Sequence, residues 1–149
     1  MKQLNSCIAG LGNVGSNLIL SLEDGKELIK FKTSLNFNIC GISAKNRNKK
    51  RIFNLENYNW INNPLDLLEK KCDIIIELIG EEKGISYDLV KNALKKKIHV
   101  ITANKALLAK HGSELFEIAE KNQVLLLFEA AVAGGIPIIK NLTKSIFLN

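Results

Sequence analysis

The sequence predicts an α/β protein with a doubly wound, mostly parallel sheet that forms one domain over residues 1–149. Short apolar runs rich in β-branched residues alternate with longer amphipathic segments, and a glycine-rich turn follows the first run. Strand–helix alternation at this spacing is typical of a parallel sheet with helices on both faces. The length fits a single domain, and a hydrophobic content of 46% is enough to build its core.

Five apolar runs are expected to form the strands. They span residues 6–11, 37–43, 73–80, 99–102 and 124–128. The third run contains Ile74, Ile75 and Ile76 in succession, which is typical of a parallel strand buried on both faces. In a sheet of such strands, ligands are expected beyond the carboxyl ends.

The segments between the runs predict the helices. These are expected over residues 14–32, 64–68, 86–97, 104–112 and 114–121, with a last helix from about residue 137. Pro64 suits a first helical turn, and Asn104 is placed to cap the fourth helix. The apolar positions of the first helix include Leu18, Leu22, Leu28 and Phe31. The basic, asparagine-rich stretch over residues 44–63 has no clear assignment.

The composition favours an untargeted cytoplasmic protein. No run approaches the roughly 18 apolar residues that a membrane span needs, and the N-terminus lacks the apolar core of a signal peptide. The net charge of +6 comes from lysines spread over several segments without interleaved aromatic residues. This pattern favours a solvated basic surface over a nucleic-acid interface.

Cysteines and histidines suggest no metal site. Cys7, Cys40 and Cys72 lie far apart in the sequence, each in or beside an apolar run. An odd number of cysteines without metal-binding spacing argues against a disulfide framework or a zinc site, and buried thiols are expected. His99 and His111 belong to no motif and are expected to have structural roles.

A GxGxxG motif occupies the first predicted turn. Its residues are Gly10, Leu11, Gly12, Asn13, Val14 and Gly15. The pattern alone is weak, and a glycine turn without a ligand is the alternative, but here it follows a strand and opens a helix. In that position the first glycine permits the turn, the second lets a pyrophosphate approach, and the third lets the helix pack closely. The motif therefore predicts a Rossmann-type NAD(P)-binding domain.

The end of the second strand favours NADP, with NAD also possible. NAD enzymes usually place an acidic residue there, whereas this chain has Ser43-Ala44 followed by several cations. Lys45 and Arg47 are the candidates for pairing with the 2′-phosphate, against the alternative that each is simply solvated.

Two later segments carry a resemblance to a known family. These are Ile101-Thr102-Ala103-Asn104-Lys105-Ala106-Leu107-Leu108-Ala109 and Phe128-Glu129-Ala130-Ala131-Val132-Ala133-Gly134-Gly135-Ile136-Pro137-Ile138-Ile139. Together with the glycine motif and Glu77-Leu78-Ile79-Gly80, they make the chain resemble homoserine dehydrogenase. The resemblance implies NAD(P)-dependent interconversion of L-homoserine and L-aspartate 4-semialdehyde, a step in threonine, methionine and isoleucine biosynthesis.

The resemblance also implies residue roles. Lys105 is the implied catalytic residue beside the nicotinamide and the substrate, and Thr102 and Ala103 would line the cofactor site through their backbone. A monovalent cation, usually sodium in this family, would be held near the hinge to a substrate domain. Its implied ligands are the Glu129 carboxylate and the carbonyls of Val132, Gly134 and Ile136. The alternative is that Glu129 braces the helix that is expected from about residue 137.

The chain departs from the family pattern in two places, which limits the family properties that can be expected of it. Glu81-Glu82 stands where the family commonly has a second glycine after Gly80. The substrate-binding and dimer-forming region is absent after Asn149, so residues 1–149 are expected to be monomeric, to bind cofactor weakly and to turn over nothing. A homodimer is expected for the full-length enzyme. The alternative function is a non-catalytic NADP(H)-binding module, which would need no continuation of the reading frame.

Overall fold

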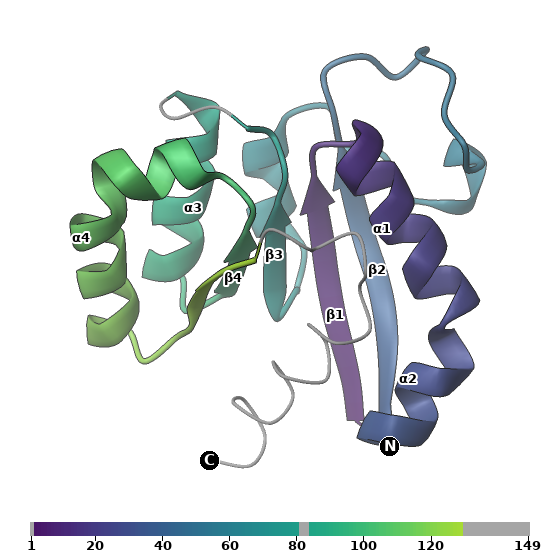
Figure 1. The fold of residues 1–149 in the computed structure, drawn as a ribbon, viewed down its shortest axis with the longest axis horizontal. Helices are drawn as coiled ribbons and strands as arrows, with labels where there is room; N and C mark the ends of the chain where they lie inside the picture. Colours follow the sequence, from purple (N-terminus) through teal and green to yellow (C-terminus); the bar gives the residue numbers. More distant parts are fainter. Residues whose placement is uncertain (1, 81–83, 130–149) are drawn as a thin grey trace.

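The computed structural model describes residues 2–80 and 84–129, and these form a five-stranded parallel sheet with helices on both faces (Figure 1). The strands are β1 (Lys2–Ala9), β2 (Leu35–Ser43), β3 (Ile74–Glu77), β4 (His99–Thr102) and β5 (Leu126–Phe128). Their order across the sheet is β2-β1-β3-β4-β5. All five predicted strands are confirmed. The first begins four residues earlier than expected, and the third ends at Glu77 instead of Gly80.

The stretch over residues 44–63, which had no clear assignment, adds one isolated β-bridge to the sheet on the outer side of β2. Trp60 forms a single parallel bridge with Ile42, whose amide donates to the Asn59 carbonyl at 3.0 Å. The Ile61 amide in turn donates to the Ile42 carbonyl at 2.8 Å. When this bridge is counted, the strand order becomes the 3-2-1-4-5-6 order of dinucleotide-binding sheets. The order reverses between β1 and β3, and the ligand crevice is expected there.

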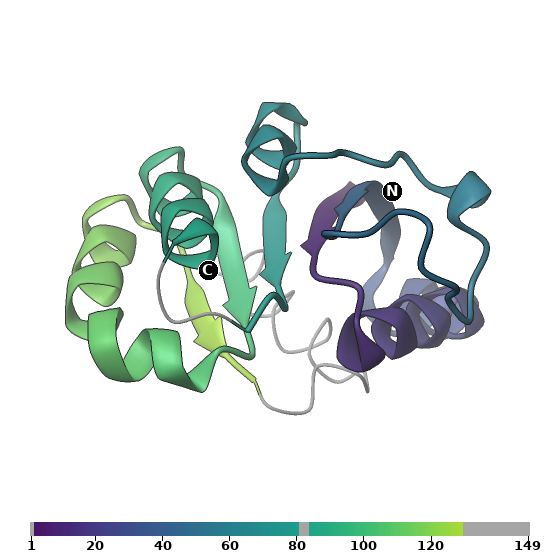
Figure 2. The same cartoon turned by 90° about the horizontal axis from the view of Figure 1, so that it is seen from above.

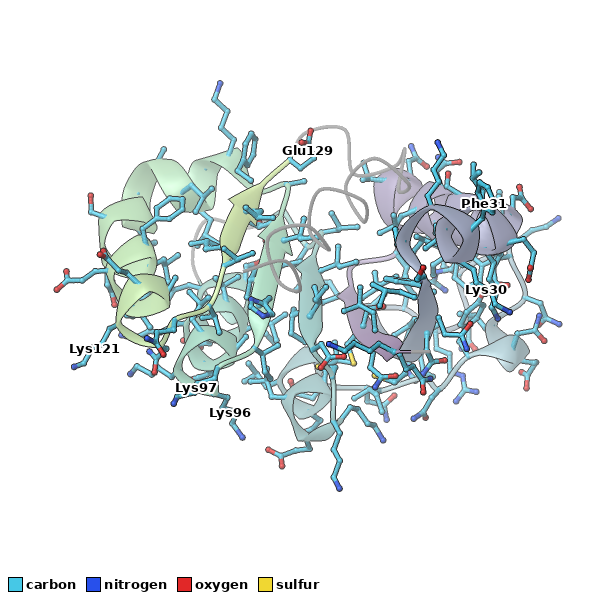
Figure 3. The ribbon with its side chains drawn as sticks, turned by 90° about the horizontal axis from the view of Figure 1, so that it is seen from below. Lys30, Phe31, Lys96, Lys97, Lys121 and Glu129 are labelled. Carbon is cyan, nitrogen blue, oxygen red and sulfur yellow. The ribbon has the colours of Figure 1, made fainter. Side chains whose placement is uncertain are left out.

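The predicted first helix is two helices, which corrects the sequence prediction. α1 (Asn13–Asp24) ends at Gly25, and α2 (Lys26–Thr33) starts directly after it. The Gly25 amide donates to Ser21, while its carbonyl accepts from Ile29, so Gly25 closes one helix and opens the next. The break rotates the apolar face: Ile29 is buried, whereas Leu28 is exposed and Phe31 is 85% exposed (Figure 3).

The predicted break at Gly112 is wrong, because α4 (Lys105–Lys121) runs through it. Gly112 is buried inside the helix, and a glycine in a helix interior costs only about 1 kcal/mol relative to alanine. The predicted cap is confirmed, since the Asn104 side chain accepts from the Leu107 amide at 3.0 Å. The helix expected from about residue 137 lies outside the described residues.

The remaining helices are α3 and two short 3₁₀ turns. α3 (Ile85–Lys95) matches its prediction closely. The first 3₁₀ turn, η1 (Leu55–Asn57), lies in the unassigned stretch. The second, η2 (Pro64–Glu69), begins at the predicted proline, and the Asn63 side chain caps it by accepting from the Leu65 amide.

The sheet separates two apolar layers. Along β3, Ile74 and Ile76 face the layer that includes α1 and α2, whereas Ile75 faces the layer that includes η2, α3 and α4. Figure 2 shows α1 and α2 on one side of the sheet and α3 with η2 on the other. This alternation is the expected period of a strand that is buried on both faces.

Basic side chains are distributed over distant parts of the surface. In Figure 3, Lys96, Lys97 and Lys121 lie near the ends of α3 and α4, while Lys30 lies on α2 at the other end of the sheet. No helix within the described ranges is long and apolar enough to cross a membrane.

Candidate nucleotide-binding cleft

The carboxyl ends of the five strands form one row. Ala9 pairs with Ser43 on one side and with Glu77 on the other, Glu77 pairs with Thr102, and Thr102 pairs with Phe128. The residues that follow these strand ends therefore lie together at the carboxyl end of the sheet, which is called the sheet edge below. This edge gathers the glycine motif, Leu78, Ala103 and Glu129, although they are far apart in the sequence.

The glycine corner after β1 depends on two close backbone approaches. Gly10 has a φ of +101°, which side chains rarely tolerate, and a Cβ there would collide with the Leu78 carbonyl. A Cβ at Gly15 would collide with the carbonyl oxygen of Gly10. Both positions therefore require glycine for the corner to close against the segment that follows β3.

Gly12, the second glycine of the motif, differs from these two. A Cβ built on Gly12 meets nothing within 4 Å, so the corner is open to the solvent at this point. Gly12 is also the N-cap of α1 and supplies no side-chain cap. The first amides of a helix have no intrahelical acceptor, and with the helix dipole they form an anion site. Asn13 and Val14 are exposed, whereas Leu11 is buried.

A cavity of about 470 Å³ extends from this corner to the loop after β2. Its lining residues are Gly10, Leu11, Gly12, Ser43, Ala44, Lys45, Asn46, Lys49, Arg51, Asn62, Pro64, Leu78, Ile79 and Ile85. Three cations border it, namely Lys45, Lys49 and Arg51. Of the two cations singled out from the sequence, Lys45 lies here, whereas Arg47 does not border the cavity.

Arg51 fixes the loop after β2, a role that the sequence did not reveal. Its guanidinium donates to the carbonyls of Asn46 at 2.6 Å, Lys49 at 3.0 Å and Arg47 at 3.3 Å. It also lies 5.5 Å from the centre of the Trp60 ring, within cation–π range. The contacts with carbonyls span up to five residues in an irregular segment, so no periodic pattern could have indicated them.

Two buried polar atoms at the cavity have no hydrogen-bond partner among the described residues. They are the hydroxyl oxygen of Ser43, a fully buried residue, and Nε of Arg51. Buried polar groups are nearly always hydrogen-bonded to protein, to an ordered water or to a ligand, so these two atoms are candidates for contact with a bound polar group. With the open anion site at Gly12, these residues fit the ribose and phosphates of a dinucleotide.

Glu77 links the cleft to the neighbouring strand. Its side chain is fully buried at the end of β3 and accepts from the Thr102 hydroxyl at 2.6 Å and from the Ile79 amide at 2.8 Å. The Thr102 hydroxyl accepts from the Asn104 amide at 2.9 Å. One carboxylate thus positions both the segment after β3, which borders the cavity, and the segment before α4.

Lys105 is the first residue of α4 and is exposed. It follows Thr102, the buried last residue of β4, and the half-buried Ala103. These residues share the sheet edge with the glycine corner, two strands away, which corresponds to about 10 Å across a sheet. Lys105, Thr102 and Ala103 do not line the 470 Å³ cavity.

The implied cation ligands are only partly described. Glu129 follows β5, at the same sheet edge, and its amide donates to the Thr102 carbonyl at 3.0 Å (Figure 3). Val132, Gly134 and Ile136 lie outside the described residues. Within residues 2–80 and 84–129, no group of three or more His, Cys, Asp or Glu side chains is arranged to hold a metal ion.

The two histidines have contacts away from the cleft. His99 Nδ1 accepts from the Leu125 amide at 3.0 Å, which ties the start of β4 to the segment before β5. The His111 ring packs on Tyr87 with 4.3 Å between the ring centres. The Tyr87 hydroxyl and Lys91 both contact Glu114, so this group joins α3 to α4.

Comparison with known proteins gives a consistent result. Residues 10–129 match the family described as homoserine dehydrogenase, NAD binding domain. Homoserine dehydrogenase of Neisseria gonorrhoeae is 37% identical over 150 residues, which cover 100% of this chain and 34% of that protein. The chain thus spans about a third of the length of the curated relatives it matches.

Solved structures agree with the sequence comparison. The crystal structure of S. aureus homoserine dehydrogenase at pH 7.0 has a TM-score of 0.81 and 38% identity, covering 87% of this chain and 33% of that one. Homoserine dehydrogenase of Thiobacillus denitrificans has a TM-score of 0.79 and 35% identity, covering 100% of this chain and 34% of that one. The chain belongs to the family of homoserine dehydrogenase NAD-binding domains.

Proposed function

We propose that the protein serves as the cofactor domain of a homoserine dehydrogenase and prefers NADP to NAD. The observation that carries the proposal is the cleft itself, where an open helix N-terminus at Gly12 and a cationic loop meet in one cavity. The substrate pair, L-homoserine and L-aspartate 4-semialdehyde, and a homodimeric full-length enzyme rest on family membership.

The proposed cofactor contacts divide between backbone and side chains. The amides that open α1 hold the pyrophosphate, and the Ser43 hydroxyl binds a ribose hydroxyl. Lys45 and Lys49 supply positive charge for the 2′-phosphate, while Arg51 orders their loop and offers its unpaired Nε. Because Ser43 stands where NAD enzymes usually carry a carboxylate, nothing at this strand end repels that phosphate.

Lys105 is proposed to act on the substrate side. A nicotinamide cofactor would supply the hydride chemistry, and the protein supplies orientation and charge. The lysine begins α4 at the same sheet edge as the glycine corner, where its ammonium can position the substrate or assist proton transfer. Glu77 holds the preceding segment through Thr102 and thus positions Lys105 indirectly.

A monovalent cation site that includes the Glu129 carboxylate is the last part of the proposal. Carboxylate and carbonyl oxygens suit a hard cation, and Glu129 directly follows β5, at the carboxyl end of the sheet. The test is thermal unfolding in sodium or in tetramethylammonium chloride at equal ionic strength. Sodium should raise the midpoint for the wild type and not for Glu129→Gln.

The main test is calorimetric titration of residues 1–149 with NADP⁺ and with NAD⁺. Binding of NADP⁺ that is several-fold tighter than NAD⁺ supports the proposal, and absence of binding by either contradicts it. Turnover is proposed to require the additional region that the longer relatives possess, so oxidation of L-homoserine by residues 1–149 alone would contradict that part.

The role of Lys105 is tested in the complete enzyme. Lys105→Ala should lower kcat for homoserine oxidation strongly while NADP⁺ affinity changes little. Lys121→Ala, at the far end of the same helix and exposed, is the matched control and should retain full activity. Equal activity of the two variants would exclude Lys105 from catalysis.

A further inference from the structure

The three cysteines, far apart in the sequence, converge beneath the cleft. The Sγ atoms of Cys7 on β1 and Cys40 on β2 are 3.3 Å apart. Cys72, which precedes β3, packs against the same apolar cluster as Cys7 and Cys40. Cys7 is buried as expected, whereas Cys40 and Cys72 are only half-buried, which corrects that expectation.

A β-bulge brings Cys7 and Cys40 to the same face of the sheet. Ser6 pairs with Ile39, but the next residue, Cys7, pairs with Gly41, so Cys40 is the extra residue between them. In such a bulge two residues oppose one on the neighbouring strand. Gly41 completes the arrangement, because a Cβ there would lie 3.4 Å from the Cys7 sulfur and 3.0 Å from Leu67.

The surroundings distinguish the two thiols. Hydrogen bonding with Cys7 and then with Cys72 lowers the pKa of Cys40, and the positive charge of Lys70 lowers it further. The hydrogen bond with Cys40, together with burial, raises the pKa of Cys7. Either thiol can donate to the other across the 3.3 Å contact, and the Cys40 thiol also donates to the Ser6 carbonyl at 3.3 Å. Reaction with oxidants follows thiolate character and exposure, so within this pair the half-buried Cys40 reacts before the buried Cys7.

We propose that Cys7 and Cys40 form an oxidation site in which a peroxide converts the two thiols into a reversible disulfide between β1 and β2. Cys40 loses its proton, and the resulting thiolate attacks one peroxide oxygen and breaks the O–O bond, giving a sulfenic acid and hydroxide. The Cys7 sulfur then attacks the Cys40 sulfur and displaces the second hydroxide, and the two thiol protons complete two waters. The two sulfurs together lose two electrons, which reduce one peroxide.

The backbone geometry accommodates this bond. Neighbouring strands lie about 4.8 Å apart, and disulfides join Cα atoms that are roughly 4.4–6.8 Å apart. The sulfurs must close from 3.3 Å to roughly 2.05 Å, which side-chain rotation can supply. The bond would join the two strands that lead to Gly10 and Ser43, whose backbones are themselves linked by a 2.8 Å hydrogen bond.

Peptide mapping after peroxide treatment tests the proposal. The purified, reduced protein is treated with hydrogen peroxide under native conditions, and thiols are counted after denaturation. The count should fall from three to one and return to three with dithiothreitol. Mass spectrometry of the digest should find the Cys7 peptide joined to the Cys40 peptide within one chain. A Cys40–Cys72 link, a cross-link between chains, or oxidation without any link would overturn the proposal.

Two variants sharpen the test. Cys72→Ser should still lose two thiols and form the same linked peptide, while Cys40→Ser should leave Cys7 unlinked. Cys40 is half-buried, so its replacement is better tolerated than that of Cys7. Circular dichroism before treatment checks folding, and the wild-type peptide map decides the matter even if a variant fails to fold.

Discussion

The two walls of the cleft are built in opposite ways. The corner after β1 is almost entirely backbone, fixed by close approaches at Gly10 and Gly15 and left open at Gly12. The loop after β2 depends on long side chains, with Arg51 bound to three carbonyls and packed near Trp60. Under the proposed function, the backbone would contact the pyrophosphate, which all dinucleotides share, whereas the side chains would contact the 2′-phosphate, which distinguishes NADP from NAD. Loss of one wall should therefore abolish binding, and changes to the other should alter preference.

Gly12→Val should give the largest effect because it blocks the backbone wall. A side chain at this position meets no protein atom, so the fold should survive, but it occupies the space where phosphate approaches. We expect both NADP⁺ and NAD⁺ to bind at least about 100-fold more weakly, roughly 2.7 kcal/mol, in calorimetric titration. Gly15→Ala is the contrast: it collides with the Gly10 carbonyl and should lower the unfolding midpoint instead. Unchanged cofactor affinity in Gly12→Val would refute the backbone wall.

Glu77→Gln tests whether the backbone wall needs support from β3. The buried carboxylate accepts from Thr102 and Ile79, and an amide cannot accept both bonds with the same oxygens. Hydrogen bonds to charged groups contribute roughly 1.5–3 kcal/mol, so the free energy of unfolding should fall by about 2 kcal/mol in urea denaturation. Glu69→Gln, which breaks only an exposed contact with Lys96, should change nothing measurable. Similar stability of the two variants would remove Glu77 from this role.

Lys49→Ala tests the side-chain wall. Lys49 and Lys50 are both exposed, but only Lys49 borders the cavity, so Lys50→Ala is a matched control. We expect NADP⁺ affinity to fall about tenfold in Lys49→Ala, roughly 1.4 kcal/mol, with NAD⁺ affinity unchanged. An equal loss for both cofactors would mean that this wall does not discriminate between them.

The smallest effect is expected at His99, which begins β4 and so lies at the amino ends of the strands, away from both walls. Burial lowers the pKa of His99, whose Nδ1 accepts from the Leu125 amide. The unfolded chain takes up a proton near pH 6.5 while the folded chain does not, so stability should fall as the pH drops below about 6.5. His99→Asn should reduce this slope in denaturation between pH 5 and 7.5, with cofactor affinity at pH 7.5 unaffected. An unchanged slope would show that His99 does not cause it.

The same contrast explains what could be predicted from the sequence. The glycine motif and the strand ends follow from local rules, since glycine spacing and apolar runs dictate them within a few residues. The loop after β2 does not, because Arg51 reaches back to Asn46 and across to Trp60 with no period to reveal it. The two glycines in helical segments show the same limit of sequence-based prediction. A helix ends at Gly25, whereas another continues through Gly112, and the residue type alone does not distinguish the two cases.

The single bridge at Trp60 also bears on self-association. An outer strand with free amides and carbonyls invites another chain to add a strand, and proteins block this with coverings, bulges and polar residues. Here Trp60 covers β2 at Ile42, the bulge at Cys40 interrupts its regularity, and Asn36 is exposed farther along the strand. The outermost position beside β2 is therefore a single bridge at Trp60, which is a poor template for edge-to-edge aggregation.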